Sequence, residues 1–328
     1  MLVYLFRKKH PNGFSIEKLF NVLYHTMQQR MSVQRLEMPT GTAGVWTALK
    51  NAWYVRQHLS GNILHITGDV HYGALLTPFT RTIITIHDCG MLKRGKGLKR
   101  LILWLLWFRL PMAFASAITV ISTQTRDELL SVVKLPLHKI HVIPNFVDPQ
   151  YQYAHKPFDR HRPRVMHIGT RDNKNLPRVI VALAGLPVFL VIVGPLNDVQ
   201  LALLIQHDIG YENYPAPNDT ILLSLYESAD LISFPSTYEG FGMPILEAQA
   251  VGRAVLTSNR EPMRSVAGAG AILVDPESVV AMRTGFLSLL NNSVLREQLI
   301  SDGLHNVRQY TLESVAQQYQ QLYEQSDA

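Results

Sequence analysis

The stretch SFPSTYEGFGMPILEAQAVGRAVLTS, residues 233–258, joins the end of an apolar strand to a glycine-bearing loop and a helix. The strand ends at Pro235, and Pro244 opens the helix at a position where its missing N–H has no helical partner to lose. The backbone N–H groups of residues 240–242 are therefore expected to face the carboxyl edge of a sheet. Open α/β folds bind their ligands at that edge, and a helix N-terminus there suits phosphate.

Two acidic residues flank this loop. Glu239 lies in the loop and Glu247 is expected in the first helical turn, with seven residues between them. A carboxylate near a helix N-terminus is a common cap, so Glu247 alone carries little information. The pair around a glycine loop is better explained by sugar and ribose hydroxyls, which need acceptors beside amides that bind phosphate.

Short apolar strands alternate with helical patterns on both sides of this stretch. The predicted strands are 2–6, 62–66, 82–86, 117–121 and 139–143 in the first half, and 164–169, 188–194, 230–235, 254–258 and 271–275 in the second. The predicted helices are 15–30, 122–133, 175–184, 198–207, 243–251 and most of 278–324. This alternation predicts right-handed crossovers and parallel sheets that are covered on both faces.

The length of 328 residues fits two domains, each large enough to bury a core. Residues 149–163 hold three prolines and no strong periodicity, which predicts an interdomain linker. The first domain is then 1–148 and the second begins at 164. The loop 211–218 is expected to help select the donor.

Composition excludes several classes of protein. Hydrophobic residues make up 47% and charged residues 17%, which argues against disorder. The longest apolar run, Leu101–Phe108, has eight residues and is too short to span a membrane. The first six residues are followed directly by the charged residues Arg7, Lys8 and Lys9, so they are interpreted as a strand and not as a signal peptide. One cysteine, Cys89, excludes a disulfide framework and fits a reducing cytoplasm.

The net charge of +6 comes from one segment. Residues 91–110 carry six Lys and Arg side chains and no acid, so the rest of the chain sums to zero (6 − 6). A binder of nucleic acid usually spreads its basic residues over a face, so nucleic acid is not an expected partner.

The same basic segment runs into tryptophan and leucine, which is typical of a helix that anchors on anionic lipid. A core helix is the alternative, because Leu101–Phe108 is apolar all round. Membrane contact is the favoured interpretation. The residues expected to make it are Lys96, Lys99, Arg100, Trp104 and Trp107.

Six segments, in order, resemble the retaining glycosyltransferases of family 4. PSTYEGFGMPILEA is similar to that family's Glu-x7-Glu signature. The other segments are TIHDCGML (85–92), VISTQTRDELL (120–130), HVIPNFVD (141–148), HIGTRDNKNLPRVIVAL (167–183) and LYESADLISFPS (225–236). The resemblance implies a GT-B fold, in which two Rossmann-like, doubly wound α/β domains with parallel sheets face a central cleft. It also implies that 1–148 binds the acceptor, that 164–310 binds the nucleotide sugar, and that a last helix in 311–328 packs back on the first domain.

The resemblance also implies roles for single residues. Glu239 would meet the donor sugar as a catalytic residue, with His87 and Asp88 reaching sugar and acceptor from the first domain. The donor would be bound by Gly13, Arg171, Lys174, Gly240, Phe241, Gly242 and Glu247. Of these, Arg171 and Lys174 would hold the diphosphate and Glu247 the ribose. A cation at the start of a helix is otherwise disfavoured, which supports a ligand for Lys174.

These observations predict a cytoplasmic, retaining hexosyltransferase that uses a UDP- or GDP-linked sugar. A glycan or lipid-linked acceptor and a role in bacterial surface-polysaccharide assembly follow from the resemblance, and the membrane interpretation places the protein on the inner face of the plasma membrane. The chain has no Asp-x-Asp motif, so a metal-free reaction is expected. No other cofactor is predicted. Two alternatives remain open, namely a GT-B-fold sugar-nucleotide epimerase and a non-catalytic protein that binds a sugar nucleotide or a membrane surface. Turnover of the donor separates the binding protein from the transferase.

Overall fold

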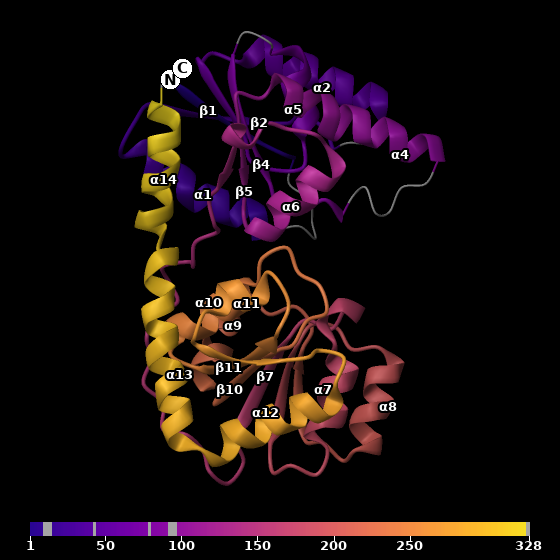
Figure 1. Cartoon of the computed structure of the whole chain (residues 1–328), viewed down its shortest axis with the longest axis vertical. Helices are drawn as coiled ribbons and strands as arrows, with labels where there is room; N and C mark the ends of the chain where they lie inside the picture. Colours follow the sequence, from indigo (N-terminus) through magenta and orange to yellow (C-terminus); the bar gives the residue numbers. More distant parts are fainter. Residues whose placement is uncertain (9–14, 42–43, 78–79, 91–96, 326–328) are drawn as a thin grey trace. The chain divides into compact units, whose positions relative to one another are not determined.

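The computed structural model of the chain describes residues 1–8, 15–41, 44–77, 80–90 and 97–325. They form two compact units. Unit 1 comprises Met1–Phe146 and Leu312–Ala328, and unit 2 comprises Val147–Thr311. The chain leaves unit 1 after Phe146 and returns to it at Leu312, so unit 2 is inserted into unit 1 (Figure 1).

Unit 1 contains a parallel sheet whose six strands, within the described residues, follow the order β2-β1-β3-β4-β5-β6. These strands are β1 (Leu2–Phe6), β2 (Val33–Glu37), β3 (Ile63–Ile66), β4 (Arg81–Ile86), β5 (Ala117–Val120) and β6 (Ile140–Val142). Successive side chains point to opposite faces. Val3 and Leu5 enter one core while Leu2 and Tyr4 enter the other, so both faces of the sheet are buried.

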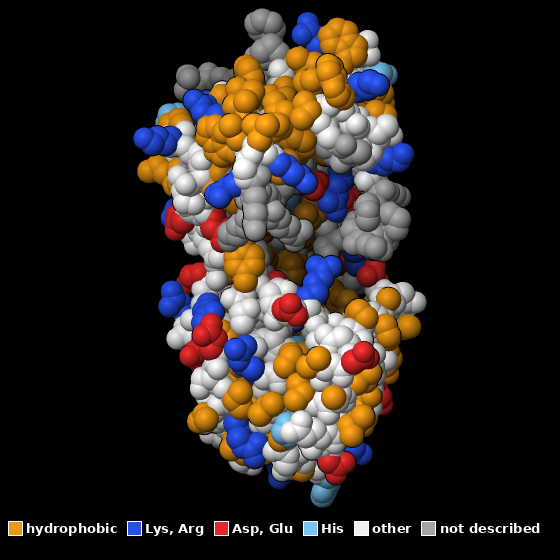
Figure 2. Space-filling model, turned by 90° about the vertical axis from the view of Figure 1, so that its right-hand side faces the viewer, with side chains coloured by type: hydrophobic (Ala, Val, Ile, Leu, Met, Phe, Trp, Pro, Cys, Tyr) orange, Lys and Arg blue, Asp and Glu red, His pale blue; other side chains and the backbone are white. Residues whose placement is uncertain are grey.

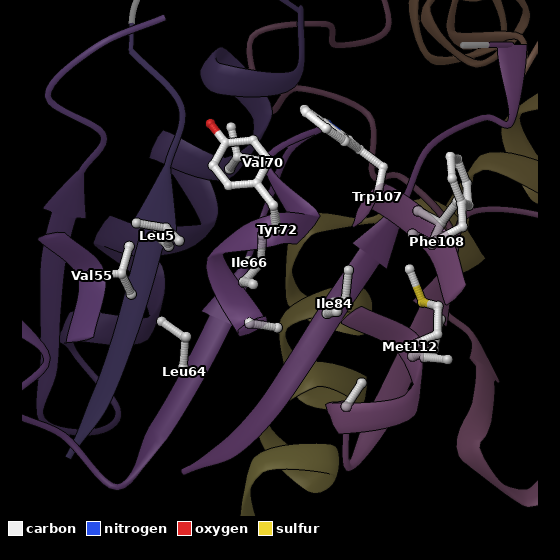
Figure 3. Close-up of a cluster of buried hydrophobic side chains, with 14 of the residues drawn as sticks. Leu5, Val55, Leu64, Ile66, Val70, Tyr72, Ile84, Trp107, Phe108 and Met112 are labelled. Carbon is white, nitrogen blue, oxygen red and sulfur yellow. The ribbon is translucent and has the colours of Figure 1, made fainter. Parts of the chain in front are cut away.

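Helices cover both faces of this sheet. One face packs against α1 (Ser15–Gln28) and α14 (Leu312–Glu324). The other face packs against α2 (Val45–His58), η1 (His71–Leu76), η2 (Trp104–Arg109), α5 (Leu110–Phe114) and α6 (Thr123–Val132). Figure 3 shows the second core, where Trp107 and Phe108 lie beside Ile84 and Met112. The described residues of the unit also form the short elements α4 (Gly97–Leu103) and η3 (Leu137–Lys139).

The last helix, α14, closes the core on its face of the sheet. Its buried side chains are Val315, Ala316, Tyr319, Leu322 and Tyr323. The Tyr323 hydroxyl is hydrogen-bonded to Tyr4 (2.9 Å) and to Nδ1 of His65 (2.6 Å). Arg81 donates to the carbonyl oxygens of Leu322 and Tyr323, which are left without helical partners at the end of α14. Packing and capping therefore both fix α14 on unit 1.

Unit 2 contains a second parallel sheet, whose six described strands follow the order β12-β11-β10-β7-β8-β9. They are β7 (Arg164–Ile168), β8 (Phe189–Val193), β9 (Tyr211–Tyr214), β10 (Leu231–Phe234), β11 (Ala254–Ser258) and β12 (Ala271–Val274). This is the strand order of a dinucleotide-binding Rossmann sheet, and its direction of winding reverses between β7 and β10.

The helical elements of unit 2 follow its strands and cover its sheet (Figure 1). They are η4 (Asp172–Lys174), α7 (Leu176–Leu183), α8 (Asp198–Gln206), α9 (Asp219–Ser228), α10 (Met243–Val251), α11 (Met263–Ala267), α12 (Val279–Asn291), α13 (Ser293–Asn306) and η5 (Val307–Tyr310). The alternation of strands and helices predicted from the sequence, with parallel sheets buried on both faces, is confirmed.

The structure adds two strands that the sequence does not predict. β2 and β9 are edge strands of their sheets, and each buries few side chains. Their sequences, VQRLE and YENY, therefore lack the apolar run of a central strand. The residues Tyr211–Tyr214, predicted as part of a loop, are the strand β9.

The segment 149–163, predicted as a linker, makes its contacts with unit 2. Ala154 accepts a hydrogen bond from Arg253 (2.8 Å), and Lys156 forms an ion pair with the buried Asp230. Asp230 also accepts the backbone N–H of Asp159 at 3.1 Å. These residues are thus held along unit 2 by specific polar contacts.

Candidate active site

The expected donor site lies where the winding of the second sheet reverses. β7 and β10 are neighbours there, and the loops that follow them leave the sheet at the same edge. The loop after β7 contains Arg171 and Lys174, and the loop after β10 contains Glu239. Open α/β sheets bind ligands at this switch point, so the fold brings the two predicted segments to the expected place.

Lys174 and Glu239 form an ion pair at this edge. Nζ of Lys174 lies 2.6 Å from Oε1 of Glu239, and the two side chains are 19% and 14% exposed. The ammonium group also lies 4.6 Å from the ring centroid of Phe234, the last residue of β10. Gly169 has φ +92°, and a Cβ there would come within 2.7 Å of the Lys174 stem. Glycine at 169 therefore lets the lysine pass across the backbone.

Two asparagines, which the sequence analysis did not single out, join the two loops. Asn173 accepts the Thr237 N–H at its carbonyl oxygen (2.8 Å) and donates its side-chain amide to the carbonyl of Tyr238 (2.9 Å). Asn175 is buried at φ 68° and donates to the carbonyls of Pro235 (2.9 Å) and Pro276 (2.6 Å). These bonds fix the positions from which Lys174 and Glu239 extend.

The glycine loop leads into α10 as predicted. Gly242 is the N-cap of α10 at φ +117°, and Pro244 follows in the first turn. Phe241 is 5% exposed and packs edge-on against Tyr310, with 6.0 Å between ring centroids. The side chain of Phe241 therefore anchors the loop, while its backbone and that of Gly240 lead to the helix start. Binding of phosphate by these amides stays a prediction.

Glu247 lies past the first turn of α10, so it is not a cap. Its Oε2 accepts a hydrogen bond of 2.6 Å from the hydroxyl of Tyr226, in α9. Burial raises the pKa of Tyr226 well above its usual value, which keeps this hydroxyl protonated as a donor. Tyr151 packs edge-on against the Tyr226 ring. Tyr226, which the sequence analysis missed, therefore orients the carboxylate expected to bind ribose.

Arg171 is placed differently from Lys174. Its side chain is exposed, whereas Lys174 is mostly buried. Both follow β7, so both are within the loop that the resemblance assigns to the diphosphate.

In unit 1, three polar residues follow neighbouring strands at the carboxyl edge. Arg7 follows β1, Asp69 follows β3, and His87 follows β4. Together with His71 and Asp88 they line a cavity of about 390 Å³. Arg7 and Asp69 were not predicted, although their positions after strands 2–6 and 62–66 are a usable signal.

His87 is half-buried in this cavity and held by the backbone. Its Nε2 donates to the carbonyl oxygen of Thr67 at 3.0 Å, and its ring packs edge-on against Phe20. Burial lowers the pKa of His87, so the ring is neutral at pH 7. With Nε2 as the donor, Nδ1 is the basic nitrogen of the neutral ring. Asp88 is exposed and accepts the Gly90 N–H at 2.7 Å.

The predicted membrane residues separate into two groups. Trp107 is 4% exposed and lies in the unit 1 core, where its indole N–H donates to the Asp69 carbonyl (3.0 Å), so the prediction that it contacts membrane is wrong. Trp104 is half-buried and donates to Val132. Lys99 and Arg100 are exposed on α4. The physical reason is that one side of this apolar segment packs in the core against the sheet, whereas Lys99 and Arg100 lie on the side that faces solvent.

Two predicted residues, Gly13 and Lys96, lie outside the described residues. Within the part of the chain that the structure describes, no cluster of three or more His, Cys, Asp or Glu side chains is placed to hold a metal ion. Nor does any described helix combine the length and hydropathy needed to cross a membrane.

Two family models match the chain. "Glycosyl transferases group 1" matches residues 155–305, which lie in unit 2, and "Glycosyltransferase Family 4" matches residues 29–151, almost all of them in unit 1.

Curated relatives match shorter stretches. The O-antigen chain mannosyltransferase B of Escherichia coli is 36% identical over 110 residues, which are 34% of this chain and 28% of that protein. A phosphatidyl-myo-inositol mannosyltransferase of Mycobacterium tuberculosis is 36% identical over 108 residues, 31% of this chain and 29% of that protein. The matched stretch thus spans less than a third of either relative.

Solved structures match over nearly the whole chain. A sucrose-phosphate synthase from Thermosynechococcus elongatus has a TM-score of 0.78 at 17% identity and covers 98% of both chains. Anabaena HepE in complex with UDP and glucose has a TM-score of 0.76 at 15% identity, again over 98% of both. At these identities the likeness concerns the fold, and it confirms the predicted GT-B class. Because the two family models match successive parts of the sequence and together reach both units, the chain belongs to the family 4 type of glycosyltransferases.

Proposed function

We propose that this protein is a retaining glycosyltransferase that moves a hexose-type sugar from a UDP- or GDP-linked donor to a glycan or lipid-linked acceptor. The family supports glycosyl transfer. The names of two relatives, which act on O-antigen chains and on phosphatidyl-myo-inositol, support the acceptor class, and both are mannosyltransferases. We therefore propose that the protein is a cytoplasmic enzyme that takes part in the assembly of a bacterial surface polysaccharide.

The ion pair between Lys174 and Glu239 carries this proposal. Transfer of a sugar leaves a nucleoside diphosphate on which negative charge develops, and a fixed cation beside it stabilises the transition state. Lys174 is such a cation, because Phe234, Glu239 and the loop contacts of Asn173 restrict its position. Glu239 supplies a carboxylate that accepts hydrogen bonds from sugar hydroxyls. One pair thus provides both of the chemistries that a nucleotide sugar requires.

The pair also keeps both charges compensated until the donor binds. Two mostly buried charges would be costly if each stood alone, and here each compensates the other. On donor binding, the diphosphate takes up the positive charge of Lys174 while sugar hydroxyls donate to Glu239. The site therefore exchanges one set of charge partners for another with little rearrangement of the backbone.

We further propose that the unit 1 cavity takes the acceptor. His87 offers a neutral ring whose Nδ1 accepts a proton or hydrogen bond, and Asp88 offers an exposed carboxylate. In this proposal the donor's own phosphate helps to deprotonate the acceptor hydroxyl, and no protein nucleophile is used. The reaction is proposed to proceed without a metal ion, on the ground that the sequence lacks an Asp-x-Asp motif.

The test is release of nucleoside diphosphate from UDP-, GDP- and ADP-sugars in the presence of EDTA. Wild type is compared with Glu239→Gln, which keeps the side-chain size and removes the charge. Glu297→Gln, on the exposed side of α13, is the matched control. We expect release from one donor class, a loss of about 100-fold or more in Glu239→Gln, and no change in the control.

Each other outcome decides between functions. A product with inverted anomeric configuration by NMR contradicts the retaining mechanism. A change of the sugar without an acceptor indicates an epimerase. Tight binding of a sugar nucleotide without turnover, even with lipid-phosphate acceptors added, indicates a binding protein. Activity abolished by EDTA and restored by a divalent cation contradicts metal independence.

A further inference from the structure

The outer side of α2 exposes two tryptophans. Trp46 is 80% exposed and Trp53 is 53% exposed, and their spacing of seven residues places them on one side of the helix with Lys50 between them. The opposite side, with Ala48 and Val55, is buried in the unit 1 core. Each tryptophan presents a large apolar surface to water, and tryptophan is typical of sites where an apolar phase meets an aqueous one.

A second row of exposed apolar residues lies on α4 and η2. Leu98 is 71%, Leu101 is 55% and Leu105 is 39% exposed, at the spacing of one helix side. α2 and the segment α4–η2–α5 cover the same face of the unit 1 sheet, because α2, η2 and α5 all contact η1. Figure 2 shows hydrophobic side chains gathered over unit 1, with Lys and Arg side chains among them.

Both helices lie in stretches without acidic residues. No Asp or Glu occurs in 38–68, which contains α2, or in 89–126, which contains α4, η2 and α5. The exposed cations on these elements are Lys50, Arg56, Lys99, Arg100 and Arg109. The surface therefore combines large apolar side chains with one sign of charge.

The combination of large apolar side chains with positive charge indicates what binds to this surface. If a second copy of the chain bound symmetrically through this surface, the cations of one copy would face the same cations of the other and repel them. Lysine is also depleted in protein–protein interfaces, where the charged residues lie mainly at the rim. An anionic lipid surface satisfies both properties, because headgroups take the cations while tryptophan and leucine enter the acyl boundary.

We propose that the outer side of α2 together with α4–η2 is a docking surface for an anionic bilayer. Trp46, Trp53, Leu98 and Leu101 enter the interface, and Lys50 and Lys99 bind headgroups. This moves the membrane contact predicted from the sequence away from Trp107 and adds α2, which that prediction did not include. The inference deepens the proposed function, since a lipid-linked acceptor lies in such a surface, and it rests on that function only for this purpose.

The test is sedimentation with vesicles of phosphatidylcholine, with or without phosphatidylglycerol, in the absence of donor. The variant is Trp46→Ser with Trp53→Ser. The matched control is Val199→Ser with Ile205→Ser, two residues on α8 of unit 2 that are 65% and 78% exposed. We expect the wild type and the control to bind only vesicles that contain phosphatidylglycerol, and binding to weaken with salt. The tryptophan variant should bind at least about tenfold more weakly.

Quenching by brominated lipid gives a second measurement. Wild-type fluorescence should be quenched in bound protein through Trp46 and Trp53, whereas the double variant retains only the half-buried Trp104 and the buried Trp107 and should be quenched much less. Equal binding to neutral vesicles, or unchanged binding of the variant, would overturn the proposal. A dimer that the same variant converts to monomer would assign the surface to a second copy. Loss of transfer with intact vesicle binding would contradict only the enzymatic proposal.

Discussion

The carboxyl edges of the two sheets are built in different ways. In unit 2, side chains and backbone of Asn173 and Asn175 join the loops after β7 and β10, and one ion pair is presented. In unit 1, the corresponding edge opens into a cavity of about 390 Å³, whose ionic lining residues include the pair of Arg7 and Asp69, 3.4 Å apart. A diphosphate has a constant shape and charge, so fixed donors suit it. The difference teaches that the longer sequence motif marks the edge whose ligand is constant, while the edge proposed to take the acceptor is marked only by the short segment TIHDCGML (85–92).

The largest expected effect separates core from surface within unit 1. Trp107→Ala leaves a cavity in the core and removes the hydrogen bond to Asp69, so we expect a loss of about 3–5 kcal/mol in the free energy of unfolding. Trp46→Ala, at an 80% exposed position, should change it by less than about 0.5 kcal/mol. Denaturant unfolding measures both. Equal effects would contradict the assignment of Trp107 to the core.

The second prediction separates the two edges by function. Lys174→Ala should weaken binding of UDP or GDP by about 100-fold, because it removes the cation and leaves Glu239 uncompensated. His87→Gln should leave nucleotide affinity unchanged and lower transfer by about 100-fold. Calorimetry with the free nucleotide and an assay of transfer read the two steps independently. Weakened nucleotide binding in His87→Gln would argue against this division of roles.

The third prediction uses acid to compare the stability of the units. Burial lowers the pKa of His65 to about 3 and of His71 to about 4 in unit 1, and of His167 to about 3 in unit 2. Below pH 6.5 the unfolded chain takes up protons that these folded histidines refuse, so stability falls as pH falls. From pH 7 to 5 the loss is about 2 kcal/mol for each histidine.

Unit 1 should therefore lose at least about twice as much stability as unit 2 over this interval, because burial also lowers the pKa of His87 in unit 1. Hydrogen exchange resolved by peptide, compared for β4 and β10 and corrected for the intrinsic rates, measures the difference. His25→Asn, at an exposed position, is the control and should leave it unchanged. Equal losses in the two units would show that the burial of His65 and His71 does not dominate the acid response.

The smallest expected effect concerns the orientation of Glu247. Tyr226→Phe removes a hydrogen bond of 2.6 Å to this carboxylate and keeps the ring in the core. We expect the KM for the donor to rise about tenfold, with a smaller change in kcat. Tyr153→Phe, at a 57% exposed position, is the control. An unchanged KM together with unchanged stability would contradict a role of Tyr226 in donor binding.

The sequence predicts the central strands of both sheets because these are buried on both faces and read as apolar runs. The edge strands β2 and β9 escape prediction, since their exposure permits polar sequences. The sequence also does not predict which residues of 97–114 are exposed. Leu101–Phe108 is apolar all round, so only contact with the sheet decides that Trp107 is inside and Leu101 outside.

The candidate site in unit 2 is predictable to the extent that it is local in sequence. Lys174, Glu239 and Glu247 lie in two short segments whose glycines and spacing resemble a known signature. Tyr226 and Asn175 act across contacts between distant segments, over 21 residues to Glu247 and 60 to Pro235. Such contacts follow from the packing of α9 on α10 and of η4 on the β10 loop, and a single sequence does not specify them.

The insertion of unit 2 into unit 1 sets the order in which the protein can be completed during synthesis. Val147–Thr311 emerges from the ribosome as one continuous piece, so unit 2 has all of its described strands before α14 is made. Unit 1 begins first and is completed last, because the face of its sheet that carries Leu2 and Tyr4 is covered only by α1 until α14 is made. A chain that stops short of Leu312 would carry a finished second domain and an open first one. The last helix is thus the element that closes the core of the first domain.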